Sequence, residues 1–481
     1  MPTKRTIITS LFWKYCERLG TQLTQFVVSI VLARILAPDD FGVVALALIF
    51  IAIANIFVQS GLNTALIQKK DADDLDFTSV FWASLGVSFI AYAIFFFAAP
   101  LIAYFYEKEI LVPVTRVLAL TIPIGVLNSI QNAYVSRHMM FRSLFYRSLG
   151  AMIPSGIAGI VAALYGAGIW AIVIQQLSIS VLNIVILWVI VPWHPSFNFS
   201  GTRLKSLFSF GWKLLCSSLL DACYSNLRGL IIGKVFTPAD LAYYNRGDHF
   251  PNLVVNNINN SIQSVMLPSL SAYQDDRPMM KKLMRRSIVT TSFLILPMMA
   301  GLAILAKPLI LFLLGEKWLP CVPFVQVYCF IYAFRPIHTS NLSAINAMGR
   351  SDIFLKLEII KEFVGIGILL GSLFLFKTPI GIAYGAAFGT LISAFINAHP
   401  NKKLMQYGYL EQLRDILPSF LLSIFMAGCL YLFSLLDIPL YFSAILQILL
   451  GIVIYIGTAK ILHFECLDYL VNTIKGFRHG R

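Results

Sequence analysis

Long apolar stretches follow one another along this chain of 481 residues, separated only by short polar segments. A helix needs roughly 20 mostly apolar residues to cross the hydrocarbon core of a bilayer. The apolar residues come in continuous runs, without the alternation of a transmembrane barrel strand. We therefore predict an all-α integral membrane protein. Its fourteen predicted spans lie near 9–36, 41–67, 78–103, 112–136, 144–164, 168–191, 207–233, 241–270, 286–306, 319–347, 354–376, 380–398, 415–435 and 439–462.

The composition supports a membrane protein. Hydrophobic residues make up 58% of the chain and charged residues 12%, whereas soluble domains have about 45–50% and 25%. The net charge of +14 would suit a nucleic-acid partner. However, the Lys and Arg residues lie in short segments between apolar runs, where membrane topology explains them. We therefore expect membrane lipids, and no nucleic acid, as partners.

The cysteines and the N-terminus indicate no special chemistry. Six of the seven cysteines lie in or beside apolar runs, and the chain has no CxxC and no Cys/His ligand spacing. We interpret them as small hydrophobic residues and expect no metal and no cofactor. Lys14, Glu17 and Arg18 interrupt the first apolar run, and no small-residue cleavage site follows. We therefore expect no cleaved signal peptide.

Basic residues are distributed asymmetrically between the two sides of the predicted bundle. With the N-terminus inside, most Lys and Arg residues fall in cytoplasmic segments, and Arg277–Arg286 alone holds five. The opposite side holds only Lys108, Lys234, Lys307, Lys317 and Lys377. Positive charge favours retention in the cytoplasm. We therefore predict a multi-pass protein of the bacterial cytoplasmic (inner) membrane with both termini cytoplasmic.

The first half of the chain is similar to the second. The segment Ala33–Phe41 parallels Gly233–Leu241 at a spacing of 200 residues, and Arg137 and Phe141 match Arg350 and Phe354 at a spacing of 213. Both halves begin on the predicted cytoplasmic side, so the repeat is parallel. We predict two six-helix lobes and a terminal helix pair; parallel halves of this kind occur in transporters that hold substrate between them. The predicted boundaries are 1–200, 201–400 and 401–481.

Polar residues recur at helical spacing inside the predicted spans. A charge at mid-membrane costs about 2.5–3.5 kcal/mol on insertion scales, so such residues usually face a cavity or a partner. The candidate substrate-binding residues form stripes on the first and seventh spans and amide groups on the second and eighth. Single members could instead snorkel to an interface or join helices. The candidates are Lys14, Arg18, Gln22, Gln25, Asn55, Gln59, Asn63, Lys213, Asp221, Arg228, Arg246, Asn256, Asn259 and Gln263.

The chemistry of these residues indicates a class of substrate. Cations suit phosphate or pyrophosphate, and amides suit sugar hydroxyls. Together they favour a polyprenyl-pyrophosphate-linked oligosaccharide whose tail stays in lipid. The chain has no GxxxxGK[ST] loop for direct ATP drive, so a gradient of H⁺ or Na⁺ is the expected energy source. The candidate coupling groups are Asp221, Asp248, Glu358 and Glu362.

Several segments resemble a known family along essentially the whole chain. LARILAPDDFGVVALAL, GLNTALIQ and SVFWASL in the first half, and SIQSVMLPSLS in the second, are similar to the polysaccharide-transporter branch of the multidrug/oligosaccharidyl-lipid/polysaccharide exporter superfamily. The similarity is to colanic-acid-exporter-like, Wzx-type members. It implies two lobes working by alternating access. It also implies export of undecaprenyl-pyrophosphate-linked repeat units for lipopolysaccharide or exopolysaccharide, with polysaccharide polymerase machinery as a candidate partner.

Three other functions stay open. A membrane polysaccharide polymerase or ligase generally needs a large external loop, and the largest one predicted here is Tyr104–Leu111. We therefore do not expect an enzyme. An ion-coupled multidrug antiporter of the same superfamily would have more acidic and aromatic stripes. A lipid II flippase of the same fold would share the chemistry described above.

Overall fold

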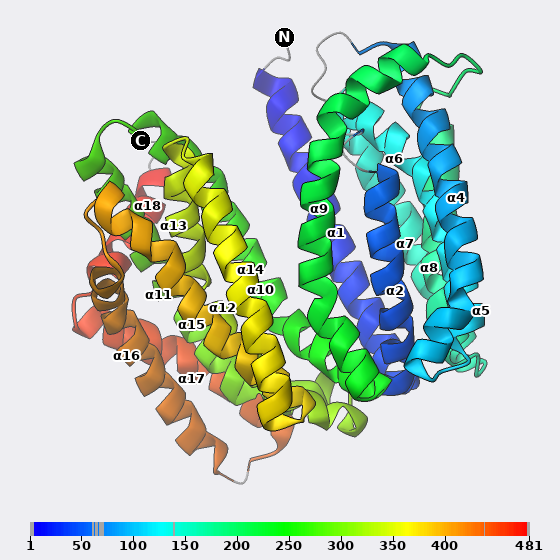
Figure 1. Ribbon diagram of the computed structural model, residues 1–481. Helices are drawn as coiled ribbons and strands as arrows, with labels where there is room; N and C mark the ends of the chain where they lie inside the picture. Colours follow the sequence, from blue (N-terminus) through cyan, green and yellow to red (C-terminus); the bar gives the residue numbers. More distant parts are fainter. Residues whose placement is uncertain are drawn as a thin grey trace. The chain divides into compact units, whose positions relative to one another are not determined.

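The computed structural model describes residues 4–59, 62, 66, 72–137, 140–436 and 438–478. Within these residues the regular structure is α-helical, apart from one 3-10 helix, η1 (Glu316–Cys321), and no strand occurs (Figure 1). The first-half helices are α1 (Lys4–Ile35), α2 (Pro38–Gln59), α4 (Asp74–Tyr106), α5 (Leu111–Ala119), α6 (Thr121–Arg137), α7 (Phe141–Leu164) and α8 (Ile169–Ile190).

The second half continues with helices of similar length. They are α9 (Gly201–Val235), α10 (Pro238–Ala272), α11 (Arg277–Leu313), α12 (Val322–Ala333), α13 (Arg335–Ala347), α14 (Ser351–Phe376), α15 (Pro379–Leu404), α16 (Tyr409–Ser434), α17 (Leu440–Ile461) and α18 (Glu465–Arg478). Within the described residues, each of the fourteen predicted spans overlaps one long helix or, in the fourth and tenth spans, two or three consecutive helical elements. The predicted all-α membrane fold is confirmed.

Two of the predicted spans are broken in the middle. The fourth divides into α5 and α6, and the tenth into η1, α12 and α13. Pro123 and Pro336 lie in the first turns of α6 and α13, where proline is tolerated because its missing N–H has no partner to lose. These prolines are 213 residues apart, the spacing of the second sequence repeat. The break is therefore a repeated feature of the fold.

Three long helices are less apolar than the others. Among the described residues, eleven helical segments are long and apolar enough to cross a membrane by length and composition. The predicted spans missing from that set are α1, α9 and α10, although these helices have 32, 35 and 35 residues. They carry most of the candidate substrate-binding residues. Their polarity, and not their length, sets them apart.

The helical hairpins α1–α2 and α9–α10 repeat the same turn. Residues 36–37 join the first pair and residues 236–237 join the second. The carboxylates of Asp40 and Asp240 each accept a hydrogen bond from the backbone N–H three residues earlier, at 3.2 and 3.1 Å. Such local capping fixes where a helix begins. The sequence repeat at 200 residues is therefore a repeat of local structure.

A close backbone approach joins these two turns. A Cβ atom built on Gly42 in α2 would lie 1.7 Å from the carbonyl oxygen of Pro238 in α10. Any larger residue would require the backbone to move, so glycine is needed at this position. Gly233 in α9 is also tight, because its Cβ would lie 2.3 Å from the side chain of Leu46.

The chain forms two compact units, Met1–Ala242 and Tyr243–Arg481. The boundary falls inside α10. Helix α9 belongs to the first unit because it packs against α2 and α4. The lobe boundaries predicted from the sequence stay a prediction.

In each unit, large apolar side chains also cover the outside, for example Phe97 at 76% and Val453 at 68% exposure, as expected for surfaces that face lipid.

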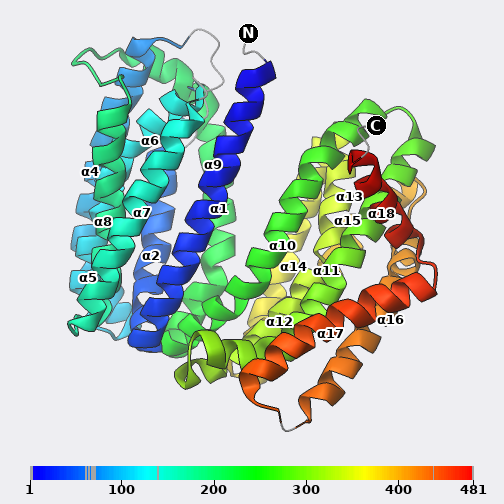
Figure 2. The ribbon, with the colours of Figure 1, turned by 180° about the vertical axis from the view of Figure 1, so that it is seen from behind.

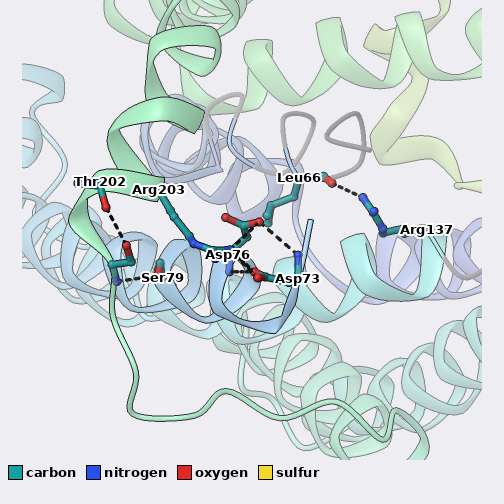
Figure 3. Close-up of polar contacts among 8 residues, drawn as sticks. Leu66, Asp73, Asp76, Ser79, Arg137, Thr202 and Arg203 are labelled. Atoms are coloured by element: carbon teal, nitrogen blue, oxygen red, sulfur yellow. Dashed lines mark hydrogen bonds and ion pairs between the residues drawn. The ribbon is translucent and has the colours of Figure 1, made fainter. Parts of the chain in front are cut away.

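Ion pairs fasten the start of α4 to the start of α9 (Figure 3). Asp73 and Asp76 form a capping box at α4, and the fully buried Asp76 carboxylate lies 3.5 Å from Arg203 of α9. Arg203 Nη1 also donates to both oxygens of Asp73 at 2.5 and 2.6 Å. That hydrogen bond and charge hold the pKa of Asp73 below its usual value and raise the pKa of Arg203. Beside them, the N–H of Ser200 donates to Ser79 Oγ at 2.9 Å.

The second unit has a comparable junction between α11 and α16. Arg285 holds both oxygens of Asp415, with Nε–Oδ2 at 3.0 Å and Nη2–Oδ1 at 2.9 Å. Lys281 Nζ lies 2.8 Å from Glu411 Oε1. The Tyr407 hydroxyl donates to Asp415 at 2.8 Å. These contacts attach the terminal helices to the rest of the second unit.

Candidate functional site

The polar stripe of α1 lies on a side of the helix that does not pack against its main neighbour. Helix α1 packs along α7 (Figure 2), and it does so through Trp13, Gly20 and Val28. Lys14, Arg18 and Gln25 are exposed, and Gln22 is half-buried. The four predicted residues of this stripe therefore lie on a face of α1 away from its contacts with α7.

A polar cluster that the sequence reasoning missed lies between α1, α6 and α7. Glu17 Oε1 accepts a hydrogen bond from Ser148 Oγ at 2.7 Å and lies 3.6 Å from Arg147 Nη2. Arg147 donates to Asn132 Oδ1 at 2.5 Å and to Ser148 Oγ at 2.9 Å. In the sequence, Arg147 and Ser148 are two polar residues near the start of the predicted span 144–164. Their partners could not be found without knowing that α1 packs on α7.

The predicted residues of α2 and α9 are only partly described. Asn55 is half-buried and Asp221 is exposed. The Arg228 guanidinium lies 5.7 Å from the centre of the Tyr224 ring, and no ion pair joins it to Asp221 within the described chain. The side chains of Gln59 and Lys213, and the whole of Asn63, lie outside the described residues.

A hydrogen-bonded network joins α10 to α12 in the second unit. The Asp248 carboxylate accepts from the Tyr332 hydroxyl at 2.9 Å and from the Asn252 amide at 3.2 Å. Asn256, one turn further along α10, donates to Asn252. Of the predicted residues, the structure therefore brings Asp248 and Asn256 together through Asn252.

The other α10 candidates, Arg246, Asn259 and Gln263, each have a different environment. The Arg246 guanidinium lies 5.6 Å from the centre of the Trp318 ring, a distance typical of cation–π contact. Asn259 is buried at 6% exposure. Gln263 accepts a hydrogen bond from Ser343 of α13. Gln263 and Asn259 therefore have an environment that also suits helix packing.

The acidic candidates of α14 differ from Asp248 in their partners. Glu358 forms an ion pair with Lys361 on the same helix, with a distance of 2.6 Å between Oε1 and Nζ. Glu362 is half-buried. The Glu358 carboxylate is therefore paired with a cation. Asp248, by contrast, is hydrogen-bonded to neutral donors.

The sequence is similar to those of proteins of polysaccharide biosynthesis. The family model described as "Polysaccharide biosynthesis protein" matches residues 31–323. The chain is 25% identical to the succinoglycan biosynthesis transport protein ExoT of Rhizobium meliloti, over 82% of this chain and 77% of that protein. It is 22% identical to the lipopolysaccharide biosynthesis protein WzxC of Escherichia coli, over 76% and 74% of the two chains.

Solved structures show the same fold. The inward closed conformation of the lipid II flippase MurJ has a TM-score of 0.75 at 17% identity, covering 95% of this chain and 99% of that one. An inward-facing multidrug resistance MATE family transporter has a TM-score of 0.59 at 16% identity, covering 83% and 95%. The chain therefore belongs to the polysaccharide biosynthesis protein family, and it has the fold of the solved MurJ and MATE structures.

Proposed function

We propose that this protein is a Wzx-type flippase of the multidrug/oligosaccharidyl-lipid/polysaccharide exporter superfamily. It moves undecaprenyl-pyrophosphate-linked oligosaccharide repeat units from the inner to the outer leaflet of the bacterial cytoplasmic membrane by alternating access. The observation that carries this proposal is the polarity of α1, α9 and α10 in an otherwise apolar bundle. Burying polar helices in a membrane is costly unless their side chains face water, a partner or a ligand. A substrate with a charged, hydroxylated head group supplies such a ligand.

The two arginines of the stripes suit the phosphate part of this substrate. Arg18 is exposed on α1, and Arg228 is half-buried on α9. The guanidinium is a planar fork that can donate to two phosphate oxygens, which the lysine ammonium cannot imitate. The exposed Gln25 on the same face of α1 suits sugar hydroxyls. We propose that these groups bind the head group while the polyprenyl tail remains in lipid.

Ion coupling is the proposed energy source, and Asp248 is the favoured coupling group. Its carboxylate is bonded to a hydroxyl and an amide. Protonation of Asp248 breaks no direct ion pair. Protonation of Glu358, by contrast, would leave Lys361 without its partner. H⁺ is therefore the simpler coupling ion for this group. Asp248→Asn is expected to uncouple transport from the pH gradient while the protein still inserts.

The test measures lipid-linked oligosaccharide on the cytoplasmic leaflet of cells that carry only the variant protein. We expect Arg18→Ala and Arg228→Ala to cause accumulation at unchanged protein level, and Arg→Lys to restore only part of the export. Arg414→Ala, at another exposed arginine, is the matched control. Normal export in both Arg→Ala variants would remove these residues from the site. Accumulation of lipid II instead would favour the lipid II flippase.

The membrane orientation is part of the proposal. We propose that both termini and Arg277–Arg286 are cytoplasmic. A cysteine introduced at Lys282, which is exposed, should react with a membrane-impermeant thiol reagent only after the cells are permeabilised. A cysteine at Lys108, between α4 and α5, should react in intact cells. Labelling of position 282 in intact cells would overturn this orientation.

A further inference from the structure

We propose that Arg147 is an anion-binding residue of the first unit that takes a phosphate group, and that Glu17 occupies this site while no phosphate is bound. The inference rests on the proposed function, because it names the part of the substrate that the site would recognise. It adds a binding residue on α7, outside the stripes of α1 and α9. It also gives Glu17, which lies beside Arg18 on α1, a specific role.

The guanidinium of Arg147 has more donors than the cluster uses. Arginine carries five N–H donors. One nitrogen, Nη1, donates to Asn132, and Nη2 donates to Ser148. Nε is buried and has no hydrogen-bond partner among the described residues. The site therefore contains an oriented cation with an unused donor.

Glu17 fits this cation only loosely. Its Oε1 lies 3.6 Å from Arg147 Nη2, which is beyond the usual hydrogen-bond range of 2.7–3.2 Å. The close contact of Glu17 is with Ser148 Oγ, at 2.7 Å. Compare Arg285, whose Nε and Nη2 both bond the Asp415 carboxylate at 3.0 and 2.9 Å. Glu17 leaves the corresponding Nε of Arg147 unpaired.

A phosphate group could satisfy what Glu17 leaves open. Its tetrahedral oxygens can accept from Nε and Nη2 of one guanidinium together. Ser148 Oγ, which now donates to Glu17, could donate to the same phosphate. Asn132 would continue to orient the guanidinium from the other side. The carboxylate and the phosphate are therefore alternative anions for one set of donors.

Exchange of these anions would alter how α1 is held. Helix α1 makes its main contacts with α7, and the Glu17 cluster is a polar attachment within that interface. Other contacts in this interface are apolar, such as Gly20 against Leu149. When phosphate displaces Glu17, this polar attachment is lost. Binding of the anion would thereby loosen α1, the helix that carries Arg18.

The experiment measures the affinity of the full-length protein in lipid nanodiscs for inorganic pyrophosphate by titration calorimetry. Glu17→Gln keeps an acceptor for Ser148 but removes the competing charge. The Glu17→Gln protein is expected to bind pyrophosphate about tenfold more tightly than the wild type. This is the gain expected if Glu17 leaves the site open to the anion only about 10% of the time and the variant leaves it fully open. Arg147→Lys keeps the charge but lacks the fork, and should bind on the order of tenfold more weakly. Both variants are first checked for folding by thermal unfolding.

Glu107→Gln is the matched control. It removes a carboxylate that pairs with Lys234 at 3.0 Å in the same unit. An equal gain in affinity in Glu17→Gln and Glu107→Gln would show a general charge effect and overturn the proposal. Wild-type affinity in a folded Arg147→Lys protein would overturn it too. If Arg147→Lys does not fold, Ser148→Ala replaces it and should also weaken binding.

These outcomes can be separated from those of the proposed function. Pyrophosphate binding that responds to Glu17 and Arg147 as expected, in a protein whose deletion causes no accumulation of lipid-linked oligosaccharide, would support the site and contradict the function. Accumulation in the deletion strain, with pyrophosphate binding unaffected by either residue, would support the function and contradict the site.

Discussion

The junctions α4–α9 in the first unit and α11–α16 in the second are built alike with opposite charges. In the first, acidic Asp73 on the earlier helix meets basic Arg203. In the second, basic Lys281 and Arg285 on the earlier helix meet acidic Glu411 and Asp415. In all three hydrogen-bonded pairs, the partners are 130 residues apart in the chain. Both junctions lie at the helix ends predicted to be cytoplasmic.

This comparison shows that the repeat preserves position and attraction rather than residue identity. An ion pair gains the same Coulomb energy whichever helix carries the cation. In each half, the helix of the third predicted span, α4 or α11, is joined by ion pairs to the first helix that follows that half, α9 or α16. Helix α16 is therefore attached to the second half in the way that α9 is attached to the first. The terminal pair is attached to the second unit in the same way as α9 is attached within the first.

Reversal of Arg285 should have the largest effect on this comparison. Arg285→Glu would place a carboxylate against Asp415, whose side chain is only 9% exposed. The Arg285 side chain is itself 59% exposed, so the cost of breaking a fully buried pair does not apply. We expect a loss of unfolding free energy of about 1.5–3 kcal/mol, the size of a hydrogen bond to a charged group, in thermal unfolding of the purified protein. The double change Arg285→Glu/Asp415→Arg adopts the charge order of the first unit and should recover most of it. A double variant no more stable than the single one would show that the charge order is not interchangeable.

Removal of the α4 cap should have an intermediate effect. Asp73→Ala removes both the acceptor for the Asp76 N–H and the partner of Arg203. Loss of an N-cap costs about 1 kcal/mol, and the ion pair adds little because both side chains are over one-third exposed. Asp276→Ala removes the cap of α11, whose carboxylate accepts from the Met279 N–H at 3.0 Å. Matching losses in thermal unfolding would show that the two caps are equivalent; a much larger loss for Asp73 would assign more weight to Arg203.

The Lys281–Glu411 pair should contribute less. Its side chains are 31% and 45% exposed, and exposed pairs contribute about 0.2–1 kcal/mol. A double-mutant cycle of Lys281→Ala and Glu411→Ala should give a coupling energy in that range at low salt. Because salt screens exposed charges, the coupling should fall toward zero at about 1 M salt. A coupling that persists there would indicate a buried contribution.

The smallest expected effect is the pH dependence of the first junction. The pKa of Asp73 is lower in the folded protein because Arg203 bonds its ionised form. The pair therefore stabilises the protein above the ordinary aspartate pKa of about 3.9. This contribution is lost as the pH falls through the lowered pKa of the folded state. Arg203→Gln should flatten the acid limb of a stability–pH curve below about pH 4. An unchanged acid limb would show that other carboxylates dominate.

The sequence was sufficient to predict the helices but not the contacts between them. Apolar runs predict membrane helices well because each span needs hydrocarbon along its whole length. The breaks in the fourth and tenth spans were missed, although Pro123 and Pro336 mark them. The α4–α9 and α11–α16 junctions were missed because a search for identical residues cannot find Asp73 replaced by a cation. The Glu17 cluster was missed because only the packing of α1 on α7 brings its members together.

The reduced apolarity of α1, α9 and α10 also has a consequence for biogenesis. A helix enters the bilayer by partitioning from the translocon, and polar residues make this step less favourable. Helix α1 is followed closely by α2, whose mean hydropathy of 2.8 is the highest among the eleven apolar segments, so the two can enter as a hairpin. Helices α9 and α10 follow one another without an apolar helix between them. Both would have to remain beside the translocon until the apolar helix α11 is synthesised. Membrane insertion is therefore expected to fail most readily while this middle region is being synthesised.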